Sequence, residues 1–242
     1  MEGLSRADAL VQAGIVPTYR RFDANPVAAV PPPTPAATDD TTSLDLARGI
    51  WAETVSPADT LVEPYLRTRR LRLLAGAPLR YHPRCPRGRE RLPAMVALMT
   101  DPATGAPCGV HRTFLDPVTG AKASGQAKMM LGRAGVIRLV PDAEVGTGLG
   151  VTEGLETGLA LIQHARWSPV WACGSAGGIA GLPVLAGIDC LTVFPDRDDK
   201  GAGIAAAEAC GARWLAAGRD YRLVLPPDTT DWHDALATGD QP

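Results

Sequence analysis

The alternation of two kinds of segment after Gly146 constrains the fold of this chain more than any other feature. Short apolar runs rich in β-branched residues alternate there with longer amphipathic segments that have helical spacing. Parallel strands need a long crossover connection, which a helix usually supplies, so this order predicts a mainly parallel α/β sheet flanked by helices. The expected strands are residues 149–152, 170–173, 190–194 and 221–225, and the expected helices are residues 156–165, 203–217 and 232–237.

The segment before Gly146 has a different pattern, and we expect a small α+β subdomain there. Apolar residues at helical spacing predict two short helices within residues 44–73. Beyond them, β-like runs are separated by turn-forming sequences that include two Asp-Pro-x-Thr-Gly pentapeptides, at 101–105 and 116–120. The expected strands of an antiparallel sheet are residues 79–82, 94–100, 109–115 and 136–140.

A proline-rich stretch sets the expected domain organisation. Residues 27–42 are rich in Pro, Ala, Thr and Asp and should behave as a stiff linker, which leaves residues 1–26 peripheral. We therefore expect three parts. They are a peripheral segment with its linker at 1–42, a basic α+β subdomain at 43–145 and an α/β domain at 146–242.

The net charge of −2 conceals an asymmetry between the two halves. Residues 65–138 contain 14 Lys and Arg against three Asp and Glu, whereas residues 151–242 contain six basic and 12 acidic residues. A basic stretch followed by an acidic one indicates a surface for a phosphate backbone beside a carboxylate-rich, metal-binding surface. A chance clustering of solvated arginines is the alternative.

Other sequence features concern the compartment and the cysteines. No apolar run approaches the roughly 20 residues needed to cross a bilayer, and no signal pattern opens the chain, so we expect a cytoplasmic protein. The five cysteines include no Cys-x-x-Cys pair, which predicts reduced core thiols. An alternative for some of them is a two-plus-two zinc site built from His82, Cys85, Cys108 and His111.

Acidic side chains follow three of the expected parallel strands. The carboxyl ends of such strands lie along one edge of the sheet, so these side chains should gather there. Several carboxylates without matching cations would repel one another, and oxygen ligands favour Mg²⁺ or Mn²⁺ over zinc. Each cluster alone could instead be a solvated turn or a helix cap. The residues are Glu153 after the first strand, Asp196, Asp198 and Asp199 after the third, and Asp231 and Asp234 after the fourth.

Two blocks of sequence resemble the Toprim domain that bacterial primases share with type IA and type II topoisomerases and certain nucleases. Residues 151–157 read Val-Thr-Glu-Gly-Leu-Glu-Thr, and residues 193–201 read Val-Phe-Pro-Asp-Arg-Asp-Asp-Lys-Gly. The resemblance implies a Rossmann-like fold and assigns catalytic and metal-binding roles to the family's carboxylates. Glu153 would be the general acid/base or metal-organising group, Asp196 and Asp198 would be metal ligands, and Asp231 would be a further ligand.

One position departs from the pattern of replicative primases. Many of them carry a second acid four residues after the glutamate, whereas this chain has Thr157 there and an acid at Glu156. This form, with Ser-Ala-Gly-Gly at residues 175–178, is closer to the Toprim proteins of phages, plasmids and other mobile elements. Glu156, Asp199 and Asp234 are therefore secondary site candidates.

The resemblance extends upstream to the start of the primase catalytic core. Residues 64–71 and 79–83 are similar to that start, and His111-Arg-Thr with two later lysines occupies the place of its basic motif. In that family a basic surface guides single-stranded template toward the metals. The candidate contacts to template or nucleotide phosphates are Arg112, Lys122, Lys128 and Arg133.

Together these features imply a DNA primase-like nucleotidyltransferase that makes short RNA primers on single-stranded DNA by two-metal catalysis with Mg²⁺ or Mn²⁺. Its partners would be the template, ribonucleotides and a replicative helicase. One alternative is a Toprim nuclease, which would use the same carboxylates to activate water. The other is a non-catalytic DNA-binding accessory protein of a mobile element, which would act through the basic half alone.

Overall fold

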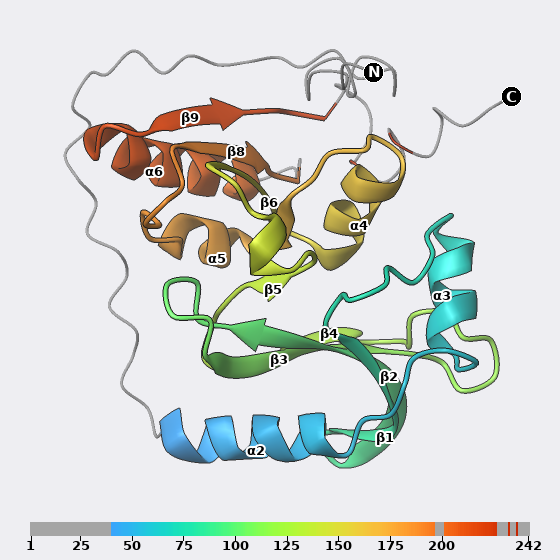
Figure 1. Ribbon diagram of the computed structural model, residues 1–242. Helices are drawn as coiled ribbons and strands as arrows, with labels where there is room; N and C mark the ends of the chain where they lie inside the picture. Colours follow the sequence, from blue (N-terminus) through green and yellow to red (C-terminus); the bar gives the residue numbers. More distant parts are fainter. Residues whose placement is uncertain (1–39, 197–200, 227–231, 233–235, 237–242) are drawn as a thin grey trace, which may run out of the picture. The chain divides into compact units, whose positions relative to one another are not determined.

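The structure is a computed structural model that describes residues 40–196, 201–226, 232 and 236 (Figure 1). The described chain falls into two compact units, and the boundary between them lies between Ile137 and Arg138. Each unit is considered by itself. The helix expected at 232–237 lies mostly outside the described residues, as do four of the acidic site candidates: Asp198, Asp199, Asp231 and Asp234.

The N-terminal unit contains two helices and a four-stranded antiparallel sheet in the order β1-β2-β3-β4 (Figure 1). Both expected helices and the first three expected strands are present, and β1 and β2 are longer than the sequence predicted. The elements are α2 (Asp40–Ala52), α3 (Val62–Thr68), β1 (Leu79–Arg87), β2 (Glu90–Thr100), β3 (Pro107–Phe114) and β4 (Lys128–Gly132).

Helix α2 packs against one face of this sheet. Ala47 and Ile50 of the helix are buried in a cluster with alternate residues of the central strands, as the period of two in a strand requires. Trp51 packs against the same cluster at its edge. The strand residues in this core are Cys85, Ala94, Val96, Val110 and Phe114.

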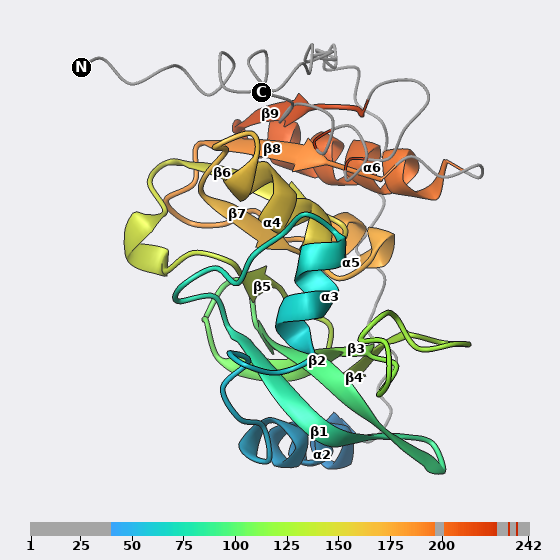
Figure 2. The ribbon, with the colours of Figure 1, turned by 90° about the vertical axis from the view of Figure 1, so that its right-hand side faces the viewer.

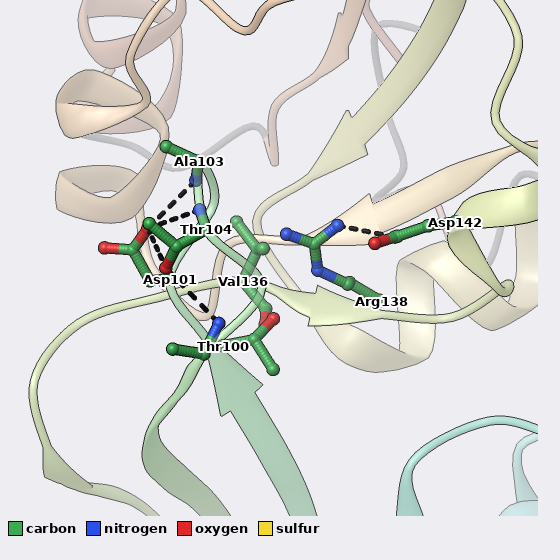
Figure 3. A network of polar contacts seen from close by, with 8 residues as sticks. Thr100, Asp101, Ala103, Thr104, Val136, Arg138 and Asp142 are labelled. Carbon is green, nitrogen blue, oxygen red and sulfur yellow. Dashed lines mark hydrogen bonds and ion pairs between the residues drawn. The ribbon is translucent and has the colours of Figure 1, made fainter.

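The two Asp-Pro-x-Thr-Gly pentapeptides form the same turn. Asp101 Oδ1 accepts hydrogen bonds from the backbone N–H of Ala103 and from the backbone N–H and hydroxyl of Thr104, at 2.9–3.0 Å (Figure 3). Asp116 Oδ1 accepts the equivalent three, at 2.8–3.0 Å. These hydrogen bonds stabilise the charged carboxylates and lower the pKa of both aspartates.

The C-terminal unit is built on a five-stranded sheet in the order β5-β7-β6-β8-β9. The pairs β6–β7, β6–β8 and β8–β9 are parallel, which confirms the predicted α/β class. The elements are β5 (Ile137–Arg138), η1 (Asp142–Glu144), β6 (Gly148–Thr152), α4 (Leu155–Gln163), β7 (Val170–Ala172), α5 (Ala176–Gly181), β8 (Cys190–Phe194), α6 (Ala202–Ala216) and β9 (Asp220–Leu223).

One predicted strand belongs to a different sheet from the one expected. The run at 136–140 was expected in the antiparallel sheet, but β5 belongs to the five-stranded sheet, and only Val136 bridges to Thr100. The backbone of this run contacts both sheets, so the hydrophobic pattern alone did not show to which sheet the strand belongs.

In the C-terminal unit, Arg138 stacks on the Trp171 ring at 4.1 Å and pairs with Asp142 (Figure 3).

The Ser-Ala-Gly-Gly run at residues 175–178 begins a short helix, α5. Ser175 is its N-cap, and the Ser175 hydroxyl accepts a hydrogen bond from the Gly178 N–H at 3.1 Å. Gly178 has no room for a side chain, because an added Cβ would lie 2.2 Å from the Cys173 carbonyl oxygen. The glycine therefore allows a close approach between the helix and the end of β7.

Two further expectations can be compared with the described residues. No described helix has the length and apolar character that a membrane span would need. All five cysteines lie among the described residues without a disulfide, and four of them are buried, which is the placement expected of core cysteines.

Candidate functional site

The candidate site lies where β6 and β8 end. These strands are neighbours and run parallel, with Thr152 paired to Phe194 at their last residues. Glu153 follows β6 directly, and Asp196 comes two residues after β8. The sheet therefore brings two acidic residues that are distant in sequence to adjacent strand ends, as the strand pattern predicted.

Two glycines leave room for the carboxylates at this edge. A Cβ added at Gly154 would lie 3.8 Å from Asp196 Oδ2 and 3.9 Å from Glu156 Oε2. One added at Gly203 would lie 3.3 Å from Glu153 Oε2 and only 2.5 Å from the Asp196 carbonyl oxygen. Glu153, Glu156 and Asp196 thus all have carboxylate oxygens within 4 Å of one of these positions, although the only severe clash would be with the Asp196 backbone carbonyl at Gly203.

The start of α4 contributes two more polar groups. Glu156 and Thr157 lie in its first turn and are buried, with 4% and 7% of their surfaces exposed. The Thr157 hydroxyl donates to Asp196 Oδ1 at 3.4 Å, and the Thr152 hydroxyl donates to the Gly154 carbonyl at 2.9 Å. Since the N-terminus of a helix carries partial positive charge, it favours negative groups at this position.

The donor chemistry fits a hard divalent cation. Carboxylate oxygens beside unsubstituted glycines are the ligands that Mg²⁺ and Mn²⁺ prefer. Within the ranges that the structure describes, however, no three His, Cys, Asp or Glu side chains are placed to hold a metal ion. A complete ligand set would need residues outside those ranges, and the sequence candidates there are Asp198 and Asp231.

An aromatic contact ties residue 232 to the same strand end. The Trp232 ring packs edge-to-face on Phe194 at 5.4 Å, and Phe194 packs in the same way on Trp167 at 5.1 Å. The Trp232 indole N–H donates to the Pro195 carbonyl oxygen at 2.9 Å. Trp232 is fully buried, so this residue is anchored next to Asp196 by both packing and a hydrogen bond.

The predicted phosphate-binding residues have different surroundings. Lys128 pairs with Thr113, and Lys122 bridges to Leu115. Thr113 and Leu115 are two residues apart on one chain, so both lysines project from the same face of the sheet. Arg133 is exposed just after β4.

Arg112 is a correction to this group, because it lies inside the N-terminal unit with only 5% of its surface exposed. Its guanidinium donates to the carbonyl oxygens of Pro86 and Met130 at 2.9 and 3.4 Å and stacks over Phe114. These contacts cross-link β1, β3 and β4. We therefore assign Arg112 a structural role and remove it from the candidate phosphate contacts.

The zinc alternative is contradicted by the strand register. His82 pairs with Ala94, whereas His111 pairs with Ala97, so the two histidines are offset along the sheet. Cys85 is buried on the face that packs against α2, near Arg112, and its burial raises the pKa of the thiol to about 11. All four residues are described, and they form no metal site.

Sequence reasoning missed two groups of residues. The hydroxyl of Thr157 was treated only as a departure from the primase pattern, although it donates to a site carboxylate. The arginines of the β1–β2 hairpin were counted in the basic stretch but not singled out. Their signal was present, because residues 84–91 contain four arginines around a single glutamate.

Comparisons with known proteins agree with this description. Residues 148–240 match the family described as "Toprim domain", and residues 41–139 match "Domain of unknown function (DUF7146)". No curated protein matches the chain. The C-terminal unit is therefore a Toprim domain, preceded by a domain whose family description states no function.

Solved structures from bacteriophage T7 share the fold of the chain. One is the primase fragment of the T7 primase-helicase protein, with a TM-score of 0.50 and 18% identity, over 73% of this chain and 69% of that one. The other is a complex of the T7 lagging-strand DNA polymerase with primase domains bound to an RNA/DNA hybrid and dTTP. It matches with a TM-score of 0.51 and 17% identity, over 72% of this chain and 84% of that one. At this identity the likeness is one of fold.

Proposed function

We propose that this chain, a Toprim-domain protein with a primase-like fold, is a metal-dependent nucleotidyltransferase that makes short RNA primers on single-stranded DNA. The observation that carries the proposal is the placement of two carboxylates, Glu153 and Asp196, after the ends of the neighbouring parallel strands β6 and β8, where an oxygen-rich centre can form. Two-metal phosphoryl transfer needs such an oxygen-rich centre. The basic N-terminal unit supports a nucleic acid as the substrate.

In this proposal the acidic residues hold Mg²⁺ or Mn²⁺. Glu153 and Asp196 would bind the cations together with Asp198 and Asp231, which lie outside the described residues. The bound cations would supply positive charge that neutralises a triphosphate and activates a 3′-hydroxyl. The sequence candidates Glu156, Asp199 and Asp234 would extend this acidic shell.

The chain's own residues have separate tasks. Thr157 orients the Asp196 carboxylate by donating to Oδ1. Glu153, at the end of β6, would organise the cations or accept the proton of the attacking hydroxyl. Lys122, Lys128 and Arg133 would contact template or nucleotide phosphates.

Primer synthesis tests the proposal directly. Purified protein would be incubated with single-stranded DNA, labelled ribonucleotides and Mg²⁺ or Mn²⁺, beside the variants Glu153→Gln and Asp196→Asn. Short labelled products that both variants fail to make would support the primase. Shortening of the DNA by the wild type alone would favour a Toprim nuclease instead. DNA binding without any reaction would favour the non-catalytic accessory protein.

Partners and origin remain parts of the same proposal. A replicative helicase is the expected partner, and a plasmid, phage or other mobile element is the expected source of the gene. Co-purification of the protein with a helicase encoded on the same element would support the first of these. The proposed compartment is the cytoplasm, where the DNA template and ribonucleotides are available.

A further inference from the structure

A cavity of about 470 Å³ opens in the N-terminal unit beside the β1–β2 hairpin. It lies beyond the end of α2, on strands that are separate in sequence from the Toprim carboxylates. Neither the family matches nor the proposed reaction assigns it a role. Its lining residues are Glu53, His82, Pro83, Arg84 and Arg91.

His82 forms a buried part of the wall, with 3% of its surface exposed. Its Nδ1 accepts the Arg84 backbone N–H at 3.2 Å, so in the neutral ring the proton is on Nε2. Nε2 lies 3.2 Å from Glu53 Oε2 without forming a hydrogen bond to it. Burial lowers the pKa of His82 even though Glu53 acts in the opposite direction, so the ring is neutral at pH 7.

The positive charge of the cavity comes from two exposed arginines. Within the described ranges, neither the Arg84 nor the Arg91 guanidinium forms an ion pair, and Arg91 makes only a long hydrogen bond to the Arg84 carbonyl at 3.5 Å. The one carboxylate in the lining, Glu53, is in contact with His82. Two guanidinium groups are thus available to an anion at this position.

Other arginines of the hairpin are already engaged. Arg87 pairs with Glu90 at 2.7 Å, donates to the Ser124 carbonyl and stacks over Phe114. Arg80 stacks over Trp51. Arg84 and Arg91 therefore differ from Arg80 and Arg87, which the fold uses for packing and cross-strand contacts.

We propose that this cavity binds a phosphate group of a nucleic-acid strand through Arg84 and Arg91. Guanidinium groups bind phosphate oxygens in a bidentate manner, and two of them match one phosphodiester, with the neutral His82 ring and the Glu53 carboxylate in the same lining. Arg89, exposed at the turn of the same hairpin, would meet a neighbouring phosphate. Figure 2 shows β1 and β2 as a continuous two-stranded hairpin, which gives these cations a common support.

The inference deepens the proposed function, because it identifies where in the N-terminal unit the strand is held. It does not depend on primer synthesis. Binding is measured with EDTA present, so loss of the metal site leaves the test unchanged. A chain that binds DNA through this cavity but makes no primer would refute the proposed reaction and keep the inference.

The test compares two double variants that each remove two positive charges. Fluorescence anisotropy of a labelled oligothymidylate would be measured for Arg84→Ala/Arg91→Ala and for the control Arg48→Ala/Arg166→Ala, whose arginines are exposed and lie outside the cavity. We expect the cavity variant to bind about tenfold or more weakly than the control. Its log–log salt dependence should be shallower by about 0.7, because one phosphate contact is lost. Thermal unfolding would show that both variants are folded.

A second arm identifies the source of the phosphate. Binding of ATP and of inorganic tripolyphosphate would be measured with the same variants. An oligothymidylate defect without a nucleotide defect supports the strand backbone as the ligand. A defect confined to ATP and tripolyphosphate would overturn the assignment to a strand. Equal affinities of the cavity variant and the control for every probe would overturn the site itself.

Discussion

The Thr157 hydroxyl lies 3.4 Å from Asp196 Oδ1, so a residue of α4 donates to the carboxylate that follows β8. Many primases have an acid at the position of Thr157. Here a neutral donor takes that place, and the acidic residue beside it is Glu156. This hydrogen bond connects α4 to the end of β8 through the site.

Removal of that hydroxyl should weaken metal binding more than folding. In Thr157→Val the side chain keeps its size, and Asp196 loses a donor that orients it. We expect Mn²⁺ affinity, measured by calorimetry, to fall about fivefold to tenfold if the lost hydrogen bond contributes roughly 1 kcal/mol. Thr157→Ser, which keeps the hydroxyl, should retain the affinity. Equal affinities of the Val and Ser variants would contradict the positioning role.

Two glycines of α5 should respond in opposite ways to the same substitution. Gly178→Ala would place a Cβ 2.2 Å from the Cys173 carbonyl oxygen, so we expect the free energy of unfolding to fall by about 1–3 kcal/mol. Gly181→Ala meets no atom within 4 Å and should be neutral or slightly stabilising. Urea unfolding measures both. Similar values for the two variants would show that the close approach is unimportant.

Trp232 should stabilise the C-terminal unit although it lies in a segment that is largely outside the described residues. Trp232→Ala removes a buried ring that packs on Phe194, and we expect the free energy of unfolding to fall by about 3–5 kcal/mol. Trp232→Phe keeps an aromatic ring but loses the hydrogen bond to Pro195, worth about 1 kcal/mol, and part of the buried ring, so we expect an intermediate loss of stability. Chemical denaturation of the wild type and the two variants would measure these differences in the free energy of unfolding. An Ala variant as stable as the wild type would show that Trp232 does not stabilise the unit.

Arg112 should matter for stability rather than for DNA contact. Arg112→Ala leaves the carbonyls of Pro86 and Met130 without their donor, and we expect the free energy of unfolding to fall by about 2–4 kcal/mol. Arg89→Ala, at an exposed position in the same unit, should change it by no more than about 0.5 kcal/mol. Thermal and urea unfolding would measure both variants. Equal losses of stability would contradict the structural role of Arg112.

Acid should weaken the two pentapeptide turns. Their hydrogen bonds hold the pKa of Asp101 and Asp116 below the ordinary value of 3.8, so this contribution to stability is present above that pH. It is lost as the pH falls through the lower, folded-state values. The double variant Asp101→Asn/Asp116→Asn should therefore have a lower Tm than the wild type at pH 6. The difference should shrink toward zero below pH 3.8. A difference that stays constant over this range would show that the charges do not contribute.

Sequence alone predicted the parts of this fold whose pattern is strong and local. The strand at 190–194 has the predicted bounds, because a short apolar run between polar turns can form little else. β4 was missed, since Lys-Met-Met-Leu-Gly has no clear alternation and forms a strand by pairing with β3. Pairing with β3 thus determines the conformation of this segment, which its own sequence pattern does not.

The site was predictable in type but not in detail. Glu153 and Asp196 follow strands, and the parallel sheet determines that their ends are adjacent. The burial of Arg112 was not predictable, because a charged residue in a strand gives no sign of whether carbonyl groups surround it. The same limit applies to Arg84 and Arg91, whose importance depends on a cavity that only the folded hairpin creates.

The repeated Asp-Pro-x-Thr-Gly turn makes its loop self-contained. In each copy, the glycine N–H donates to the aspartate carbonyl at 2.9 Å, and the aspartate N–H donates to the residue after the glycine at 2.8 Å. Almost all of the hydrogen bonding that shapes the loop is thus encoded in six consecutive residues. Such a loop should therefore keep its conformation when it is grafted between two strands of an unrelated antiparallel sheet.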